Sequence, residues 1–290
     1  MKKTLLFIAT LLASYVGMAQ ETYHPTAENL KAREQFQDEK FGIFLHWGLY
    51  SMMGTTEWIM TNRDINYKEY PKLAKTFYPS EFDADAWVKA IKAAGAKYIT
   101  ITTRHHDGFS LFKTATSSYN SVDGTPFKRD IIKEMADACQ RNGIKLHLYY
   151  SHLDWGREDY PVGRTGTGTG RPKEKANWAS YNKFMNTQLT ELLTNYGKVG
   201  AIWFDGWWDH DSDAKPFDWQ LEEQYAMIHK LQPQCLVANN HHHTPFPGED
   251  IQIFERDLPG ENKAGLSGQS IGRLPFCLLY TSPSPRDRTR

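Results

Sequence analysis

One acidic residue, Asp205, directly follows a short apolar run and is the first candidate for chemistry. Residues 199–204 are mostly apolar, which is typical of a buried strand in a parallel sheet. Functional residues collect at the carboxyl ends of such strands. Trp207 and Trp208 follow closely, and indole rings beside a carboxylate suggest a sugar site, because they stack on the apolar face of a pyranose. In the alternative interpretation Asp205 caps a helix and the indoles fill the core.

Polar or aromatic side chains also follow or end the other predicted strands. They are His46, His105, His106, Tyr149, Tyr150, Asn240 and Glu255. Functional groups contributed by many strand ends favour a barrel, whereas an open sheet would concentrate them at one switch point.

Strands and helices alternate along the chain and would position these residues. Strands are expected at the following places: 41–45, 97–102, 144–150, 200–205, 235–238 and 251–254. Helices are expected over residues 30–40, 83–95, 130–143, 178–196 and 218–231. Repeated strand–helix units imply a parallel sheet. We therefore expect an α/β fold, a (β/α)8-type TIM barrel that is incomplete at the C-terminus because only six strands are found.

The adjacent histidines His105 and His106 would point to opposite faces of a strand, which suits hydrogen bonding to substrate hydroxyls better than a shared metal. Alternatively, one ring lies in the core and the other in a loop. The tract 241–243 is three histidines, but no cysteine or acidic cluster accompanies it. Residues 157–173 are rich in Gly, Thr and Arg and are expected to form a mobile loop; no Gly-Lys-Ser/Thr ending marks them as a phosphate loop.

Hydrolysis of a glycoside requires two carboxyl groups, one as nucleophile or base and one as general acid. Asp205 would be the first. The candidates for the second are Glu249, Glu255 and Glu261, on or after the sixth strand, and Glu57 across the mouth of the barrel.

The chain resembles glycoside hydrolase family 29, the retaining α-L-fucosidases, in its exported Bacteroidota-type form. Motifs in the family's order carry the resemblance over residues 41–275: residues 41–48, Glu57 with Trp58, residues 103–109, residues 149–151, and residues 203–206. By this resemblance Asp205 is the catalytic nucleophile. The residues that would bind fucose are His46, Glu57, Trp58, His105, His106 and Tyr149. No metal and no cofactor is implied.

The resemblance also shows two departures. Family members often carry an arginine shortly after the fifth strand, where this chain has Asn239, Asn240 and His241. The family's acid/base glutamate usually lies just beyond a Leu-Pro segment, but here Leu274 and Pro275 lead into residues 277–290, which show no helix or strand period. We therefore expect a truncated chain whose acid/base is missing, with Glu255 as the fallback.

The expected organisation is a signal peptide over residues 1–19, a partial catalytic barrel over 20–276 and an anomalous tail over 277–290. Two lysines, an apolar run and a small-residue cleavage site predict export to the periplasm or the cell exterior. No later stretch is long and apolar enough to span a membrane. Lys plus Arg and Asp plus Glu both number 34, so the chain has no excess of basic residues that would suggest binding to nucleic acid. Cys139 and Cys235 are expected to be core residues.

The predicted function is a retaining exo-glycosidase that releases α-L-fucose from fucosylated oligosaccharides or glycoconjugates. Two alternatives belong to other classes. One is a metal-dependent hydrolase on a similar barrel, using His46, His105, His106 and His241. The other is a carbohydrate-binding protein without turnover, because the missing acid would leave the binding residues in place.

Overall fold

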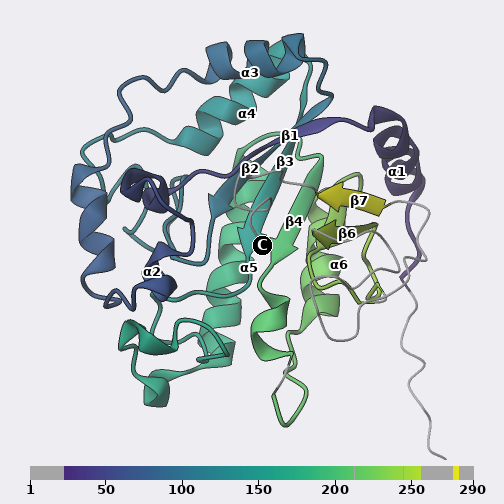
Figure 1. Cartoon of the computed structure of the whole chain (residues 1–290). Coiled ribbons are helices and arrows are strands. Elements are labelled where there is room, and N and C mark those ends of the chain that lie inside the picture. Colours follow the sequence, from purple (N-terminus) through teal and green to yellow (C-terminus); the bar gives the residue numbers. More distant parts are fainter. Residues whose placement is uncertain (1–22, 212, 244, 256–276, 281–290) are drawn as a thin grey trace, which may run out of the picture.

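A parallel sheet of seven strands forms the centre of the computed structural model, which describes residues 23–211, 213–243, 245–255 and 277–280 (Figure 1). The strands are β1 (Gly42–Leu45), β2 (Tyr98–Arg104), β3 (Lys145–Ser151), β4 (Ala201–Asp205), β5 (Leu236–Asn239), β6 (Ile251–Glu255) and β7 (Cys277–Tyr280). Each strand pairs in parallel with the next one along the chain. This unbroken order is that of a βα-barrel rather than a doubly wound sheet, and it confirms the predicted incomplete barrel.

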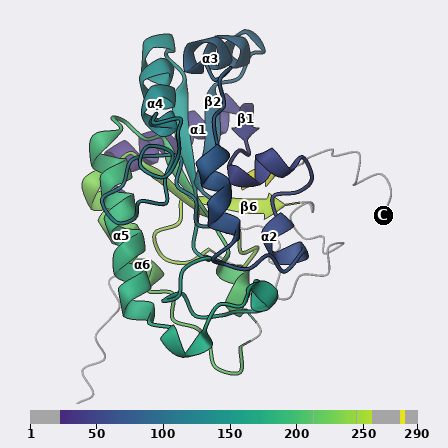
Figure 2. The ribbon, with the colours of Figure 1, turned by 90° about the vertical axis from the view of Figure 1, so that its left-hand side faces the viewer.

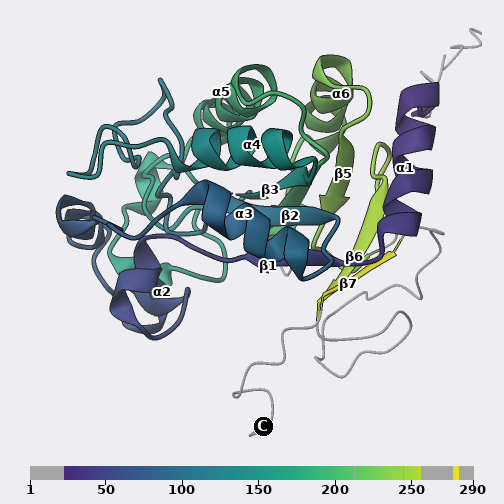
Figure 3. The same ribbon diagram turned by 90° about the horizontal axis from the view of Figure 1, so that it is seen from above.

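The helices close to the predicted positions are α1 (Ala27–Glu39), α3 (Ala84–Ala93), α4 (Ile131–Asn142), α5 (Trp178–Asn195) and α6 (Leu221–Leu231). Helices α4, α5 and α6 lie along one side of the sheet (Figure 3). The side chains of Asp83 and Asp130 accept hydrogen bonds from the first turns of α3 and α4, which fixes where these helices begin. Gly143 ends α4 with a φ of 65°, a conformation that favours glycine.

Period-two alternation divides the strand residues between two buried layers. One set packs inside the curled sheet and includes Tyr149, Trp203 and Ile253. The residues between them, such as Tyr150 and Phe204, belong to the layer under the helices. Because alternate residues share a face, the strand that buries Trp203 inward also carries Asp205 on the inner face.

Two segments differ from the sequence-based expectation. Residues 277–280 form β7 in register with β6, although no strand was expected there; the segment is too short to show a period, and the edge of β6 offers unpaired backbone groups. Residues 157–173 contain the short 3₁₀ helix η3 (Thr167–Thr169), lead into a second one, η4 (Lys173–Lys175), and are hydrogen-bonded to their surroundings. The predicted signal peptide lies outside the described residues. Within those residues, no helix has the length and apolar character needed to cross a membrane.

Candidate active site

The predicted site residues gather at the carboxyl end of the sheet. Asp205 and Glu255 end β4 and β6, Tyr149 lies in β3, His46 follows β1, His105 and His106 follow β2, and Glu57 and Trp58 precede α2 (Ile59–Asn62). The segment that carries α2 lies on the side to which β6 points (Figure 2). The α2 segment therefore covers the end of the sheet where these side chains meet.

The carboxylate of Asp205 accepts hydrogen bonds on both oxygens. Its Oδ2 accepts one from the hydroxyl of Tyr149 at 2.9 Å. Its Oδ1 accepts from the backbone N–H of Gly206 at 2.8 Å and from the indole N–H of Trp208 at 2.9 Å. The amide nitrogen of Asn240 lies 3.3 Å from the same Oδ1. These donors hold the carboxylate in one orientation at the strand end.

Burial and a neighbouring charge raise the pKa of Asp205. Removal from water, together with the negative charge of Glu255, raises the pKa of Asp205 to about 7, and the hydrogen bonds from Trp208 and Tyr149 oppose this rise. Burial and the neighbouring Asp205 raise the pKa of Tyr149 well above its usual range, so its hydroxyl stays a donor. A carboxyl that titrates near neutral pH inside a polar cluster is typical of a catalytic site.

The two adjacent histidines lie on the same side, not on opposite faces. Strand β2 ends at Arg104, so His105 and His106 stand in the following turn and strand alternation does not apply to them. Their ring centroids are 4.0 Å apart, and both rings lie beside Tyr149. The expectation of opposite faces is wrong because it applied strand alternation to two residues that follow the strand.

The hydrogen bonds of His106 indicate which of its nitrogens can receive a ligand. Its Nδ1 lies 2.7 Å from Oγ of Ser151, whose hydroxyl donates to the carbonyl of Leu153. His106 must therefore donate through Nδ1, which leaves Nε2 as an acceptor at 3.5 Å from Oδ2 of Asp205. Burial also lowers the pKa of His106 well below its usual range, so the ring is neutral. A ligand hydroxyl placed against Nε2 would supply the missing donor.

His105 and His46 extend this polar surface toward β1. Nδ1 of His105 is buried and has no hydrogen-bond partner within the described part of the chain, which is typical of an atom that a ligand satisfies. The ring of His46 lies 4.8 Å from that of His105, and its Nδ1 lies 2.8 Å from the hydroxyl of Tyr50. His46 is exposed, so it stands at the open edge of the site.

Two stacked indoles form the aromatic wall beside Asp205. The rings of Trp58 and Trp208 are 5.4 Å apart and nearly parallel, at 15°. Trp207, which the sequence suggested together with Trp208 as an indole beside the carboxylate, instead contacts His243 at 4.7 Å. The 3₁₀ helix η5 (Trp207–His210) rotates the two tryptophans to different sides, and this places Trp208 rather than Trp207 against Asp205.

Asn240 connects Asp205 to Glu255. Its amide nitrogen lies 3.3 Å from Oδ1 of Asp205 and 2.9 Å from Oε2 of Glu255. Its amide oxygen pairs with Nε2 of His242 at 2.9 Å, which fixes the amide orientation. Because both carboxylate oxygens contact the same nitrogen, they lie no more than about 6 Å apart, a range that includes the separation of about 5 Å typical of retaining glycosidases.

The other carboxyl candidates are placed differently. Glu249 is buried between the hydroxyl of Tyr225 and Nε2 of His241, so it is part of a structural network. Glu57 is half-buried, and its carboxylate accepts a hydrogen bond from Thr56 at 3.1 Å. Glu261 and the Leu-Pro segment lie outside the described residues.

Of the four histidines proposed for a metal, the rings of His46, His105 and His106 lie together, whereas His241 lies apart from them. His241 pairs with Glu249, and within residues 23–255, apart from 212 and 244, and 277–280 no group of three or more His, Cys, Asp or Glu side chains could hold a metal ion. Cys139 and Cys235 are free and buried.

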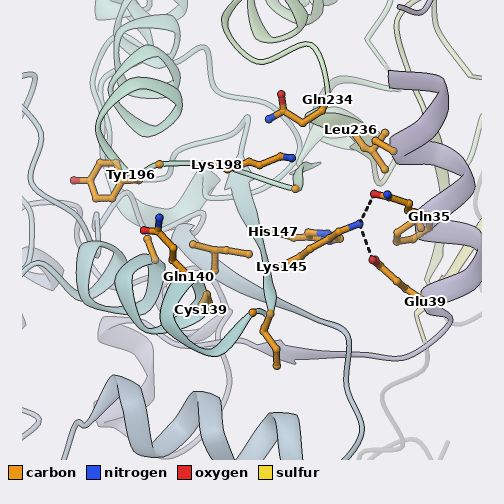
Figure 4. A pocket seen from close by; sticks show the side chains of 18 of the residues that line it. Gln35, Glu39, Cys139, Gln140, Lys145, His147, Tyr196, Lys198, Gln234 and Leu236 are labelled. Atoms are coloured by element: carbon orange, nitrogen blue, oxygen red, sulfur yellow. Dashed lines mark hydrogen bonds and ion pairs between the residues drawn. The ribbon is translucent and has the colours of Figure 1, made fainter. Parts of the chain in front are cut away.

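A cavity of about 590 Å³ lies at the opposite end of the sheet from Asp205 (Figure 4). The cavity lies between α1 and the first residues of β3. Across it, Nζ of Lys145 donates a hydrogen bond to Gln35 and forms an ion pair with Glu39, both on α1. None of the predicted site residues lines it. The amino-terminal face of such a barrel generally serves stability.

The sequence placed Trp208 and Asn240 near the site but did not predict their contacts with Asp205, and it gave Ser151 no role, although Ser151 contacts His106. The position of Asn240 in the sequence indicated a place in the site, because Asn240 directly follows β5 just as Asp205 lies at the end of β4. The contacts of Trp208 and Ser151 could not be predicted, because they depend on a 3₁₀ turn and on the contact of His106 with a neighbouring strand.

Comparisons with known proteins agree with this geometry. The family model described as "Alpha-L-fucosidase" matches residues 10–271. Plasma α-L-fucosidase of Rattus norvegicus is 31% identical over 262 residues, covering 81% of this chain and 54% of the relative. A putative α-L-fucosidase of Caenorhabditis elegans is 30% identical, covering 76% of this chain and 47% of the relative.

Solved structures show the same likeness. α-L-Fucosidase isoenzyme 1 from Paenibacillus thiaminolyticus superimposes with a TM-score of 0.69 at 36% identity, covering 81% of this chain and 59% of that one. An Asp-to-Ala mutant of α-L-fucosidase AlfC from Lactobacillus casei, solved with 4-nitrophenyl-α-L-fucopyranoside, gives a TM-score of 0.67 at 30% identity, covering 78% of this chain and 74% of that one. The chain thus spans about half the length of the curated relatives it matches. The match over most of the chain, on the predicted fold, shows that the chain belongs to the α-L-fucosidase family.

Proposed function

We propose that the protein is a retaining exo-glycosidase that releases α-L-fucose from fucosylated glycans. The observation that carries the proposal is the shared contact of Asn240 with Asp205 and Glu255, which brings two carboxyl groups together at the carboxyl end of the sheet, as hydrolysis with retention requires. The identity of the sugar is inferred from family membership. The related L. casei enzyme was solved with an aryl α-L-fucoside and with a fucosyl-N-acetylglucosamine disaccharide.

In the proposed reaction Asp205 attacks the anomeric carbon, the bond to the leaving oxygen breaks, and a covalent fucosyl-enzyme forms. Glu255 protonates the leaving oxygen and then removes a proton from the water that releases fucose. His46, Glu57, His105, His106 and Tyr149 bind the sugar hydroxyls, and Trp58 and Trp208 pack on its apolar face.

Hydrolysis of 4-nitrophenyl α-L-fucopyranoside by the wild-type chain and Asp205→Ala tests the proposal. We expect turnover in the wild type, loss of at least about 10³-fold in Asp205→Ala, and no change in Asp137→Ala, which removes an exposed carboxylate on α4. Azide added to Asp205→Ala should then yield β-fucosyl azide, because the small anion can attack from the vacated side.

Turnover that survives Asp205→Ala, or a folded wild-type chain that releases no nitrophenol, would contradict the assignment. Full activity in the presence of strong chelators would separate this mechanism from a metal-dependent one.

We further propose that the protein is exported to the periplasm or the cell exterior. Lys2 and Lys3, followed by an apolar run and a small-residue cleavage site, support this proposal. Fractionation of cells that express the full sequence, beside a version lacking residues 2–19, tests it. Retention of both versions in the cytoplasm would refute export.

A further inference from the structure

The glycine-rich segment 163–170, here called the clasp, connects two walls of the candidate site. One wall carries Trp208 on η5, and the other carries Trp58 in front of α2. The clasp contacts both: the backbone N–H of Arg164 donates to the carbonyl of Asp209 on η5, and the N–H of Gly166 donates to the hydroxyl of Thr61 on α2.

Asp209 is the centre of these contacts. Its side chain is fully buried, and its Oδ1 accepts hydrogen bonds from the backbone N–H of Thr165 at 2.9 Å and from the hydroxyl of Thr165 at 2.6 Å. Its Oδ2 accepts from the hydroxyl of Tyr160 at 2.9 Å. Within the described part of the chain no Lys or Arg forms an ion pair with it, so hydrogen-bond donors of the segment 160–165 satisfy this buried carboxylate.

The contacts continue from Asp209 to the histidine cluster. The hydroxyl of Thr165, which donates to Asp209, accepts a hydrogen bond from the indole N–H of Trp155 at 2.9 Å. The ring of Trp155 packs edge-on against Trp58 at 5.4 Å and against His106 at 5.2 Å. Trp58, Trp155 and Trp208 are therefore positioned around one hydrogen-bonded anchor.

The glycines of the clasp are required by this close approach. A Cβ atom at Gly163 would lie 2.2 Å from Oδ2 of Asp209, and one at Gly166 would lie 2.4 Å from the ring of Trp155. Gly166 also has a φ of 65°. The composition that suggested a mobile loop is instead what allows this segment to pack against its neighbours.

We propose that Asp209 is a positioning residue: by anchoring the clasp it holds Trp208 against Trp58, with the indole N–H of Trp208 directed at Oδ1 of Asp205. Asp209 itself does not contact Asp205 and takes no part in the chemistry. The expected loss of activity rests on the proposed function, whereas the positioning of Trp208 by Asp209 does not. An experiment can therefore contradict one without contradicting the other.

The test compares Asp209→Asn and Tyr160→Phe with the matched control Asp159→Asn. Asp209→Asn places an NH₂ group opposite the donors of Tyr160 or Thr165. Tyr160→Phe removes one of these donors and leaves Asp209 in place, so it remains informative if Asp209→Asn does not fold. Asp159 lies in the same connection but pairs with Arg157 and Ser180, outside the clasp. The direct measurement is the indole N–H region of the ¹H–¹⁵N NMR spectrum, with the Trp208 signal assigned from Trp208→Phe.

We expect the Trp208 N–H signal to move upfield or broaden in both test variants and to stay in place in Asp159→Asn, because its hydrogen bond to Asp205 is lost only when the clasp is released. On an aryl α-L-fucoside, kcat/KM should fall about tenfold in the test variants, which corresponds to the loss of one hydrogen bond. An unchanged Trp208 signal in both variants, or an equal change in the control, would overturn the proposal. A changed signal in a protein whose wild type releases no nitrophenol would leave Asp209 as a positioning residue and refute the fucosidase assignment.

Discussion

The hydroxyl of Tyr149 lies 2.9 Å from Oδ2 of Asp205, across the pair β3–β4. Period two puts Tyr149 on the inner face, while Tyr150 points outward to Gln188 of α5. The hydroxyl stabilises the ionised form of Asp205 and therefore lowers the pKa of a carboxyl that burial has raised to about 7.

Tyr149→Phe should weaken catalysis and change its pH dependence. An ionised Asp205 is needed for attack, so kcat/KM of the wild type should fall below about pH 7. Without the hydroxyl the pKa of Asp205 rises further, and the acid limb should move to higher pH. At its optimum the variant should lose on the order of 10- to 100-fold in kcat/KM, the value of a hydrogen bond to a charged group. The corresponding change in the outer layer, Tyr150→Phe, should leave the acid limb in place; an equal shift in both variants would contradict this explanation.

Asp205→Asn should abolish turnover and remove the pH dependence of stability that this carboxyl causes. The pKa of Asp205 in the folded protein is about 7, above its value in the unfolded chain, so folding favours the protonated form. The stability associated with this carboxyl is complete below the unfolded pKa and is lost as pH rises toward and through 7. Asn cannot ionise, so the stability of this variant relative to the wild type should rise from pH 4 to pH 7, by roughly 1.4 kcal/mol for each unit by which the pKa is raised, and level off above pH 7. Melting temperatures of the two proteins from pH 4 to 9 measure this, and a difference that does not depend on pH would exclude titration of Asp205 as the cause.

Glu255→Gln should separate substrates by their leaving groups. A general acid matters most when the departing oxygen is basic, so hydrolysis of a fucosyl disaccharide should fall by on the order of 10²- to 10⁴-fold. A dinitrophenyl fucoside needs little protonation, so its first step should be nearly unaffected and the fucosyl-enzyme should accumulate as a burst. The amide of Gln still approximates the shape of Glu beside Asn240, which limits structural side effects. Equal losses on both substrates would show that Glu255 is not the acid.

Much of this arrangement could be predicted from the sequence, since it follows from local rules. Asp83 and Asp130 identify the starts of α3 and α4, and the apolar run before Asp205 identifies the strand that presents it. The orientation of His105 and His106 could not be predicted, because it depends on whether β2 ends at Arg104 or continues. The choice of Trp208 over Trp207 depends in the same way on the 3₁₀ turn η5. The contacts of the clasp could not be predicted, because its glycines are explained only by distant neighbours.

A buried ion pair beneath the histidine turn should determine the stability of this end of the barrel. Arg104 is fully buried; its guanidinium lies 2.5 Å from Oδ2 of Asp154 and also donates to the carbonyl of Ser151 and the hydroxyl of Tyr181. Arg104→Leu would leave the charge of Asp154 buried without its cation, which typically costs about 3–5 kcal/mol.

The exposed pair between Lys133 and Asp137 provides the matched control, because solvent screens it and Lys133→Met should change stability by less than about 1 kcal/mol. Urea unfolding monitored by tryptophan fluorescence measures both free energies. If the double variant Arg104→Leu, Asp154→Leu recovers most of the lost stability, the cost arises from the unpaired charge. If it recovers none, the cost arises from lost packing against Tyr150 and Phe184, whose rings the guanidinium covers.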